Sequence, residues 1–145
     1  MDTLIIKGNI SRNFTWEEMM SSETACKHGL SNVPGEEEQQ AIEDLVKRVL
    51  QPLLQAYGDP IRISSGYRCM ELNRLTGGSP HSQHIRGEAA DCVAGNAQRL
   101  LGVLLGNDIP FDQAILYKKQ NFLHVSIKSD SRLKNRREII INNGQ

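Results

Sequence analysis

The sequence has few of the features that mark membrane, secreted or nucleic-acid-binding proteins. No apolar run in its 145 residues is long enough to span a bilayer, and residues 1–7 lack the basic region and apolar core of a signal peptide. Three widely spaced cysteines, Cys26, Cys69 and Cys92, disfavour both a disulfide framework and a cysteine-based zinc site. The 17 basic and 17 acidic residues cancel, so no net charge attracts nucleic acid or an anionic membrane. We therefore expect a protein that is cytoplasmic as synthesised.

The chain is also short and free of internal repeats, low-complexity tracts and linkers. A length of 145 residues, with 39% hydrophobic and 23% charged residues, is typical of one globular domain. We therefore expect residues 1–145 to form a single domain, and a monomer by default. The basic cluster at residues 132–137 is interpreted as a solvated surface turn.

Apolar spacing predicts one long amphipathic helix over residues 36–57. Its apolar residues recur at intervals of three and four and share one face, namely Ile42, Leu45, Val46, Val49, Leu50, Leu53 and Leu54. Pro52 lies inside this pattern and lacks a backbone donor, so we expect a kink or a break near Arg48. Gly58 is a natural residue to follow the last turn.

Shorter helices and strands are predicted around this long helix. A capping box at Thr15 and Glu18 predicts a helix through about Ser21. Two more helices are expected, at residues 69–75 and at residues 96–105 with Asn96 as the cap and Gly106 closing the helix. Strand-like runs cover residues 61–65, 88–93, 111–117, 122–128 and 138–142. Because helices come mostly first and closely spaced strands last, we expect an α+β fold with a mostly antiparallel sheet.

Residues 82–91 contain the most informative pattern in the chain. They place His84 and Asp91 seven positions apart, with Gly87 and two small alanines between them. A second imidazole, His124, follows in a predicted strand. Two imidazoles and one carboxylate with a fourth position open are the ligand set of a catalytic zinc site, and Gly87 would let the chain turn so that the ligands converge.

Each of these residues also has an ordinary structural interpretation. Strand alternation places His124 opposite the aliphatic face of its strand, where a histidine is commonly a surface residue. Asp91 could accept backbone hydrogen bonds in a turn, although a carboxylate is costly to bury without a cation or several donors. His84 could be a solvated loop histidine, or could pair with His81 as a local ligand set. A loop, however, fixes no geometry for such a pair.

Together with the surrounding motifs, the pattern resembles the zinc D-alanyl-D-alanine peptidase family. The resemblance is carried by Ser65-Gly66-Tyr67-Arg68, Ser82-x-His84-x-x-Gly87-x-Ala89-x-Asp91 and His124-Val125-Ser126, with further likeness at Phe14-Thr15, Phe111-Asp112-Gln113 and Asn135-Arg136-Arg137. It spans roughly residues 13–141 and is closest to short single-domain members from bacteria and prophages. The family includes carboxypeptidases, dipeptidases and phage endolysins that cut peptidoglycan stem peptides.

The resemblance implies a Hedgehog/DD-peptidase-like fold, in which helices pack on an antiparallel sheet that holds one Zn²⁺. The implied metal ligands are His84, Asp91 and His124. Arg68 corresponds to the arginine that binds the substrate carbonyl or carboxylate and stabilises the oxyanion, although an arginine there could also simply close a strand–helix turn. Ser82 and Gln83 correspond to positions that line the substrate cleft.

The resemblance breaks at the general base. In well-studied members an acidic residue stands three positions before the last zinc histidine, where this chain has Asn121. In the closer short relatives an acid often follows the Phe-Asp-Gln strand, where this chain has Tyr117. Glu88, Asp112 and His81 are other candidates for a base, and loss of a base typically costs about 10²–10⁴ in rate.

The sequence thus favours a zinc-dependent metallopeptidase, either a carboxypeptidase or an endopeptidase, that acts on peptidoglycan stem peptides containing D-amino acids. The alternative is a catalytically silent zinc-binding relative that binds cell-wall peptide or a protein partner. A metal-free structural domain would require all three ligand matches to be accidental. Phage-mediated release is the route by which we expect a chain without a signal peptide to reach the cell wall.

Overall fold

The computed structural model describes residues 6–144 and shows an α+β fold, as expected. In that range the helical elements are α1 (Trp16–Met20), α2 (Glu23–Lys27), α3 (Glu36–Leu45), η2 (Val46–Leu50), α4 (Gln51–Tyr57), α5 (Met70–Leu75) and α6 (Ala97–Gly106). The strands are β1 (Arg62–Ser65), β2 (Ala89–Val93), β3 (Gln113–Tyr117), β4 (Phe122–Ser126) and β5 (Glu138–Asn142). None of these helices is both long enough and apolar enough to cross a membrane.

The helix expected over residues 36–57 forms, but the break predicted near Arg48 does not occur, and a π-helical turn lies there instead. Here α3, η2 and α4 follow one another without a gap, and η2 is a single π-helical turn. The amide of Gln51 bonds the carbonyl of Val46, five residues back. This wider turn accommodates the ring of Pro52, which would clash with the Arg48 carbonyl in a regular α-helix. Gly58 then ends α4 in the left-handed conformation, with φ of 79°.

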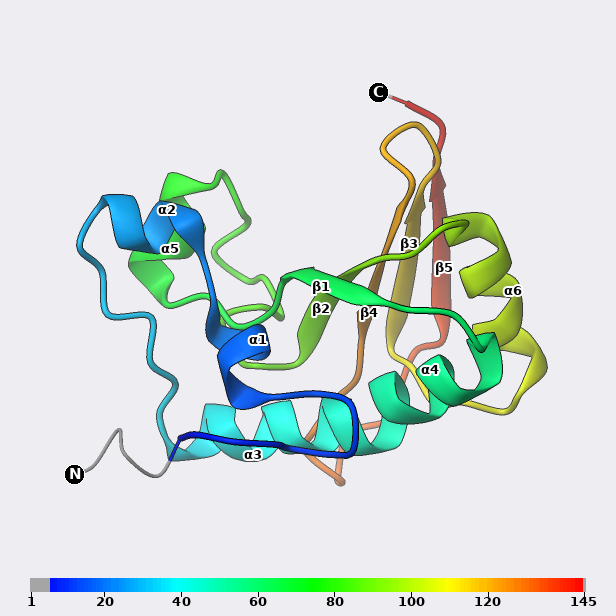
Figure 1. Cartoon of the computed structure of the whole chain (residues 1–145), viewed down its shortest axis with the longest axis horizontal. Coiled ribbons are helices and arrows are strands. Elements are labelled where there is room, and N and C mark those ends of the chain that lie inside the picture. The colour runs from blue at the N-terminus through cyan, green and yellow to red at the C-terminus, as the bar shows by residue number, and fades with distance from the viewer. Residues whose placement is uncertain (1–5, 145) are drawn as a thin grey trace.

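The five strands form one sheet in the order β1-β2-β4-β3-β5 (Figure 1). The first three pairings are antiparallel, and β5 alone runs parallel to its neighbour β3. The parallel pairing arises because the loop after β4 returns to the start of β3, where Gln113 pairs with Glu138. The predicted mostly antiparallel sheet is therefore confirmed.

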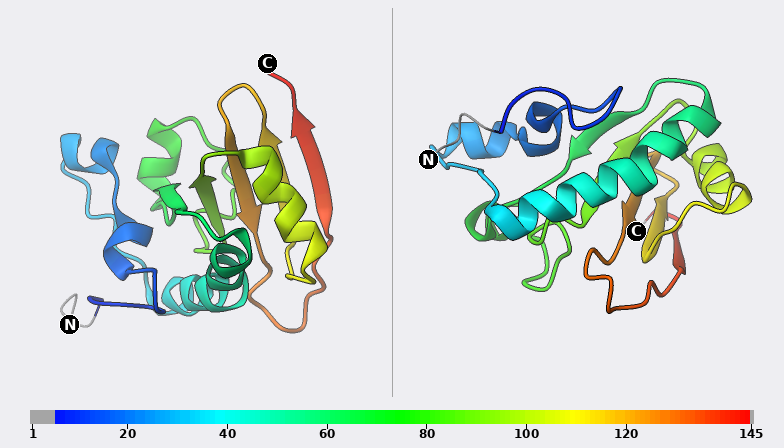
Figure 2. Two further views of the ribbon diagram at one scale, coloured as in Figure 1. Left: turned by 45° about the vertical axis from the view of Figure 1, so that its right-hand side comes forward. Right: turned by 90° about the horizontal axis from the view of Figure 1, so that it is seen from below.

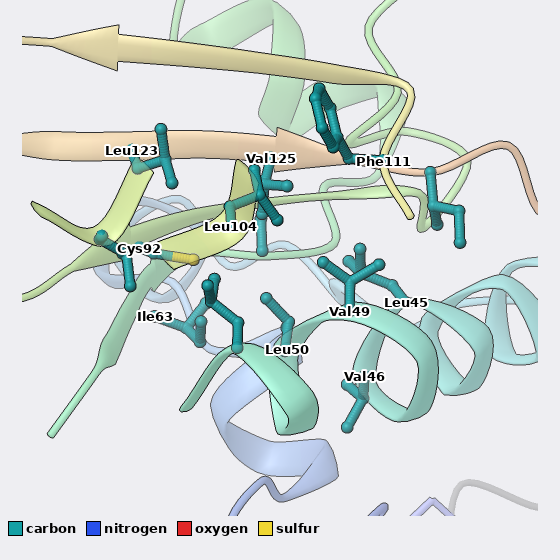
Figure 3. Packing of buried hydrophobic residues seen from close by; sticks show 14 of the residues in the cluster. Leu45, Val46, Val49, Leu50, Ile63, Cys92, Leu104, Phe111, Leu123 and Val125 are labelled. Atoms are coloured by element: carbon teal, nitrogen blue, oxygen red, sulfur yellow. The ribbon is translucent and has the colours of Figure 1, made fainter. Parts of the chain in front are cut away.

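The hydrophobic core lies between one face of the sheet and the helices α3–α4 and α6 (Figure 2). Buried side chains from the strands and helices meet there (Figure 3), among them Leu45, Val49, Cys92, Leu104, Leu123 and Val125. The strand residues between them point to the opposite face, which carries Asp91, Ile115 and His124 in adjacent register positions. That face is free of the core helices and can present polar groups.

The structure corrects several details of the sequence interpretation. Helix α2 was not anticipated, although Ser22 caps it by accepting a bond from the Ala25 amide at 3.1 Å. Gly106 is the last residue of α6 and Asn107 is its cap, and several strands are shorter than expected. The basic cluster at residues 132–137 is only partly a solvated turn. Arg136 binds the fully buried Asp112, an ion pair that joins two segments of the fold.

Candidate metal centre and substrate cleft

The three predicted metal ligands come from two strands and a loop that the fold brings together. The sheet register sets Asp91 of β2 directly opposite His124 of β4. His84 lies in the turn-rich loop between α5 and β2, and this loop ends at Gly87 with φ of 76°. A Cβ at Gly87 would lie 2.6 Å from the carbonyl oxygen of Glu38 in α3. Glycine is therefore required both by the backbone conformation and by the close approach that places His84 beside the sheet.

The donor atoms of His84, Asp91 and His124 lie within 4.8 Å of one another. Asp91 Oδ1 is 2.9 Å from His124 Nδ1 and 3.4 Å from His84 Nε2. Ligands bound tetrahedrally to one zinc ion at about 2.0–2.1 Å lie roughly 3.4 Å apart, so this spacing is close to that of a metal site. The residues present therefore fit a zinc ion, with Nε2 of His84, Nδ1 of His124 and a carboxylate oxygen of Asp91 as donors.

The tautomer of the neutral His84 ring is set by a hydrogen bond on its far side. Its Nδ1 lies 2.7 Å from the carbonyl oxygen of Gly66, which can only accept a hydrogen bond. The proton therefore resides on Nδ1, and Nε2 keeps its lone pair free toward Asp91. A backbone carbonyl that fixes the tautomer of a ligand histidine is a recurring feature of metal sites.

The Asp91 carboxyl group remains ionised in its partly buried position. Burial alone would raise its pKa, but the adjacent imidazoles of His124 and His84 outweigh this effect and hold the pKa below its ordinary value. The neighbouring residues on its face are Ala89 and Val93, which leave room beside the carboxylate. The site therefore offers a fixed negative charge, which is what a divalent cation requires.

Arg68 lies beside this cluster, with NH2 at 3.6 Å from Asp91 Oδ2. Its Nε donates to Ser65 Oγ and its NH1 donates to Asn73 Oδ1, both at 3.0 Å. Burial lowers the pKa of the guanidinium from its ordinary value, and Asp91 opposes this. An arginine stays protonated in either case, so the three contacts hold a fixed positive charge next to the metal ligands.

Two buried asparagines that the sequence interpretation missed hold Arg68 in place. Asn73 joins the guanidinium to the cleft loop, since its Nδ2 donates to the Ser79 carbonyl at 2.8 Å. Asn32 binds the backbone on both sides of Arg68. It donates to the Tyr67 carbonyl at 2.9 Å and accepts from the Cys69 amide at 2.7 Å. The sequence carries no local signal for either role, since the short helix that contains Asn73 also contains the polar residues Glu71 and Arg74.

The cluster lies on the wall of a cleft of about 670 Å³ over the open face of the sheet. Ser82 and Gln83 line this cleft, where they were expected. Ser82 Oγ accepts from the His84 amide at 3.1 Å, and Gln83 Nε2 donates to the Glu88 carboxylate and the Ile127 carbonyl. Both side chains therefore brace the loop that carries His84 as well as facing the cleft.

Of the five residues considered for the general base, only Tyr117 and His81 line the cleft. Glu88 binds Gln83, Arg86 and the Ser129 amide, away from the metal cluster. Asp112, which was expected to be able to reach the site from the neighbouring strand, is instead fully buried against Arg136. Asn121 accepts from the Ala97 amide at the start of α6.

Tyr117 stacks on Phe122 with ring centroids 4.4 Å apart. Burial and the charge of Asp91 raise the pKa of its phenol, so it is protonated at neutral pH. Among the cleft-lining residues that the structure describes, Asp91 is the only carboxylate. Among the described residues that line it, the cleft therefore holds the metal ligands and the cations Arg68, Arg86, Lys128 and Arg136, but no further carboxylate to act as a base.

Comparison with known proteins agrees with this arrangement. The family model described as Peptidase M15 matches residues 12–126, which cover all the residues of the metal cluster and Arg68. No curated protein matches the chain significantly.

Proposed function

The chain belongs to the M15 family of peptidases, the zinc D-alanyl-D-alanine peptidases, and on this premise we propose that it hydrolyses peptidoglycan stem peptides. In this proposal His84, Asp91 and His124 hold one zinc ion. The observation that carries the proposal is the convergence of these three donors within 4.8 Å on the wall of a cleft, beside Arg68.

Each residue has a defined task in this proposal. Bound zinc polarises a carbonyl group and lowers the pKa of water to about 7. Arg68 supplies a fixed positive charge where the carbonyl oxygen of the scissile bond becomes anionic, and Asn73 keeps the guanidinium from turning away. Ser82 and Gln83 face the peptide from the loop.

Zinc binding and peptide cleavage test the proposal together. Purified protein should contain one zinc per chain by atomic absorption, and mass spectrometry should detect cleavage of stem peptides or muropeptides that stops with a chelator and returns with added zinc. His124→Ala should lose both zinc and cleavage. His28→Ala is the matched control, because His28 is exposed at the end of α2 and should retain both. Zinc-independent cleavage, or full zinc content in His124→Ala, would contradict the assignment.

A second candidate function is peptide binding by a zinc-loaded but catalytically silent protein. It is favoured by one observation, the protonated Tyr117 in a cleft whose only lining carboxylate, among the described residues, is Asp91. This function predicts one zinc per chain and measurable peptide affinity without turnover. Tyr117→Glu should then create or strongly raise activity, whereas Tyr117→Phe should not. Ordinary peptidase rates in the unaltered protein would exclude the silent form.

A further inference from the structure

Strand β5 forms one edge of the sheet, and its apolar side chains are open to solvent (Figure 2). Ile139, Ile140 and Ile141 are 45%, 38% and 45% exposed. Elsewhere in residues 6–144, the exposed large apolar residues occur singly along the chain. Single exposed apolar residues are normal on a protein surface, whereas a contiguous group of them marks an interaction site. The edge at β5 is therefore a candidate for contact with another chain.

This edge also lacks the features that usually keep edge strands from pairing. Such strands are protected by charged residues or proline, by a β-bulge, or by a covering helix or loop. Residues 139–141 include neither charge nor proline, and the register of β5 with β3 is regular from Glu138 to Asn142. At the opposite edge, β1 is interrupted by a register shift between Ile63 and Ser65. Of the two edges, β5 is therefore the one that can accept a further strand.

The hydrogen bonds of the sheet show which backbone groups of β5 lie at its free edge. The amide of Glu138 donates to the carbonyl just before β3, and the carbonyl of Asn142 accepts from the amide just after β3. Both residues thus direct their backbone groups toward β3. Because this direction alternates along a strand, Ile139 and Ile141 direct their N–H and C=O groups away from the sheet.

A second copy of the same strand matches these outward groups. In an antiparallel pair centred on Ile140, Ile139 lies opposite Ile141 of the second copy, and by symmetry the reverse also holds. Each such pair exchanges two hydrogen bonds, so every outward N–H and C=O of the two isoleucines gains a partner.

The side chains of β5 match in the same register. From Glu138 to Asn142 the order is polar, three isoleucines, polar, which reads the same in both directions. Isoleucine therefore meets isoleucine across the pair, and each Glu138 carboxylate meets an asparagine amide instead of another carboxylate. The pattern of β5 is thus complementary to itself.

The geometry points to a symmetric dimer in which two copies of this chain pair their β5 strands antiparallel about Ile140. The two sheets become one continuous sheet, and the two-fold axis is perpendicular to it. Both metal-bearing clefts then open on the same side of the dimer. A contact of one short strand per chain is small, so we expect weak association, with Kd on the order of 10–100 µM. The inference does not depend on the proposed function.

Sedimentation velocity of the full chain, from about 1 µM to 1 mM, tests the dimer. We expect the sedimentation coefficient to rise with concentration from the monomer to the dimer value. Ile140→Lys sets two like charges opposite each other at the axis and should weaken association at least tenfold, with Tm unchanged. Leu75→Lys is the matched control, because Leu75 is 49% exposed at the end of α5 and should leave association intact.

Disulfide cross-linking identifies the register even if Ile140→Lys is unstable. The background is Cys26→Ser with Cys69→Ser, which leaves only the buried Cys92. Ile140→Cys should form a covalent dimer on oxidation, because directly opposite residues of this kind have Cα atoms about 4.5 Å apart. Ile139→Cys is the control, since it faces its own copy only along a diagonal of about 7–8 Å and should cross-link far less.

Two results would overturn the dimer. One is a monomer at every concentration together with no excess of cross-linking at residue 140 over residue 139. The other is a dimer that Ile140→Lys leaves intact, because association would then use a different surface.

Discussion

Two arginine–aspartate pairs close together in the chain should respond very differently to the loss of the arginine. Arg136 binds Asp112 through Nε at 3.1 Å and NH2 at 2.8 Å, and Arg132 binds Asp130 through the same atoms at 3.0 and 2.8 Å. The geometry is nearly identical. The difference is burial, because the side chain of Asp112 is 0% exposed and that of Asp130 is 37% exposed. Arg136→Ala should therefore destabilise the fold, and Arg132→Ala should not.

The magnitude follows from what remains around the buried carboxylate. Removing one partner of a buried ion pair typically costs about 3–5 kcal/mol. Asp112 keeps the amide of residue 136 at 2.8 Å and Lys128 Nζ at 3.6 Å, so its charge stays partly compensated. We therefore expect Arg136→Ala to lower the free energy of unfolding by about 2–3 kcal/mol, or Tm by roughly 5–10 °C for a chain of this size.

The pH dependence gives an independent check. Burial raises the pKa of Asp112, but Arg136 outweighs it, so the folded pKa is below the ordinary value. A depressed folded pKa contributes stability above the unfolded pKa of about 4, and this contribution is lost as the pH falls through the folded value. Thermal melts by circular dichroism should thus show a gap between wild type and Arg136→Ala that narrows from pH 7 to pH 3. Equal Tm losses for Arg132→Ala and Arg136→Ala would refute the reasoning.

Two further substitutions test the supports of the metal centre. Asn73→Ala frees the guanidinium of Arg68 and should lower kcat/KM by about 10–100-fold without loss of zinc. In an Arg68→Ala background the same substitution should have little further effect on kcat/KM. Additive losses in this double-mutant cycle would show that Asn73 does not act through Arg68. Gly87→Ala should lower both Tm and zinc affinity, because the added Cβ meets the Glu38 carbonyl and displaces the loop of His84. A Gly87→Ala variant with unchanged zinc affinity, measured by competition with a chromophoric chelator, would show that the loop adapts.

Local sequence pattern was sufficient to anticipate the elements that carry the metal ligands. Alternation in β4 correctly placed His124 on the face opposite the aliphatic residues. The same rule placed Asp91 beside Ala89 and Val93. Pro52 led to the prediction of a kink or a break near Arg48, and the chain instead forms a π-helical turn there and continues as a helix. These features depend on residues a few positions apart, so periodicity and backbone chemistry determine them.

Several of the interactions that sequence reasoning missed join distant parts of the chain. Asp112 and Arg136 are 24 positions apart, and the parallel pairing of β5 with β3 brings them together. Asn32 reaches the backbone around Arg68 across more than 30 positions. Nothing in the neighbouring residues indicates such a partner. A buried aspartate just before a strand is therefore easily mistaken for a candidate base, as Asp112 was, when it serves to anchor a returning segment.

Asn121 stands at the position where the resemblance predicts an acidic base, but its side chain does not reach the cleft. Its carboxamide accepts from the Ala97 amide and donates to the Gly95 carbonyl, at the start of α6. Its φ of 59° fits the turn between β3 and β4, where asparagine is among the residues that tolerate a left-handed conformation. An acid there would face the beginning of a helix and not the cleft. Any carboxylate that restores a base must therefore stand on the cleft face of the sheet. Tyr117, which lines the cleft and pairs with Phe122 two residues along β4 from His124, is one such position.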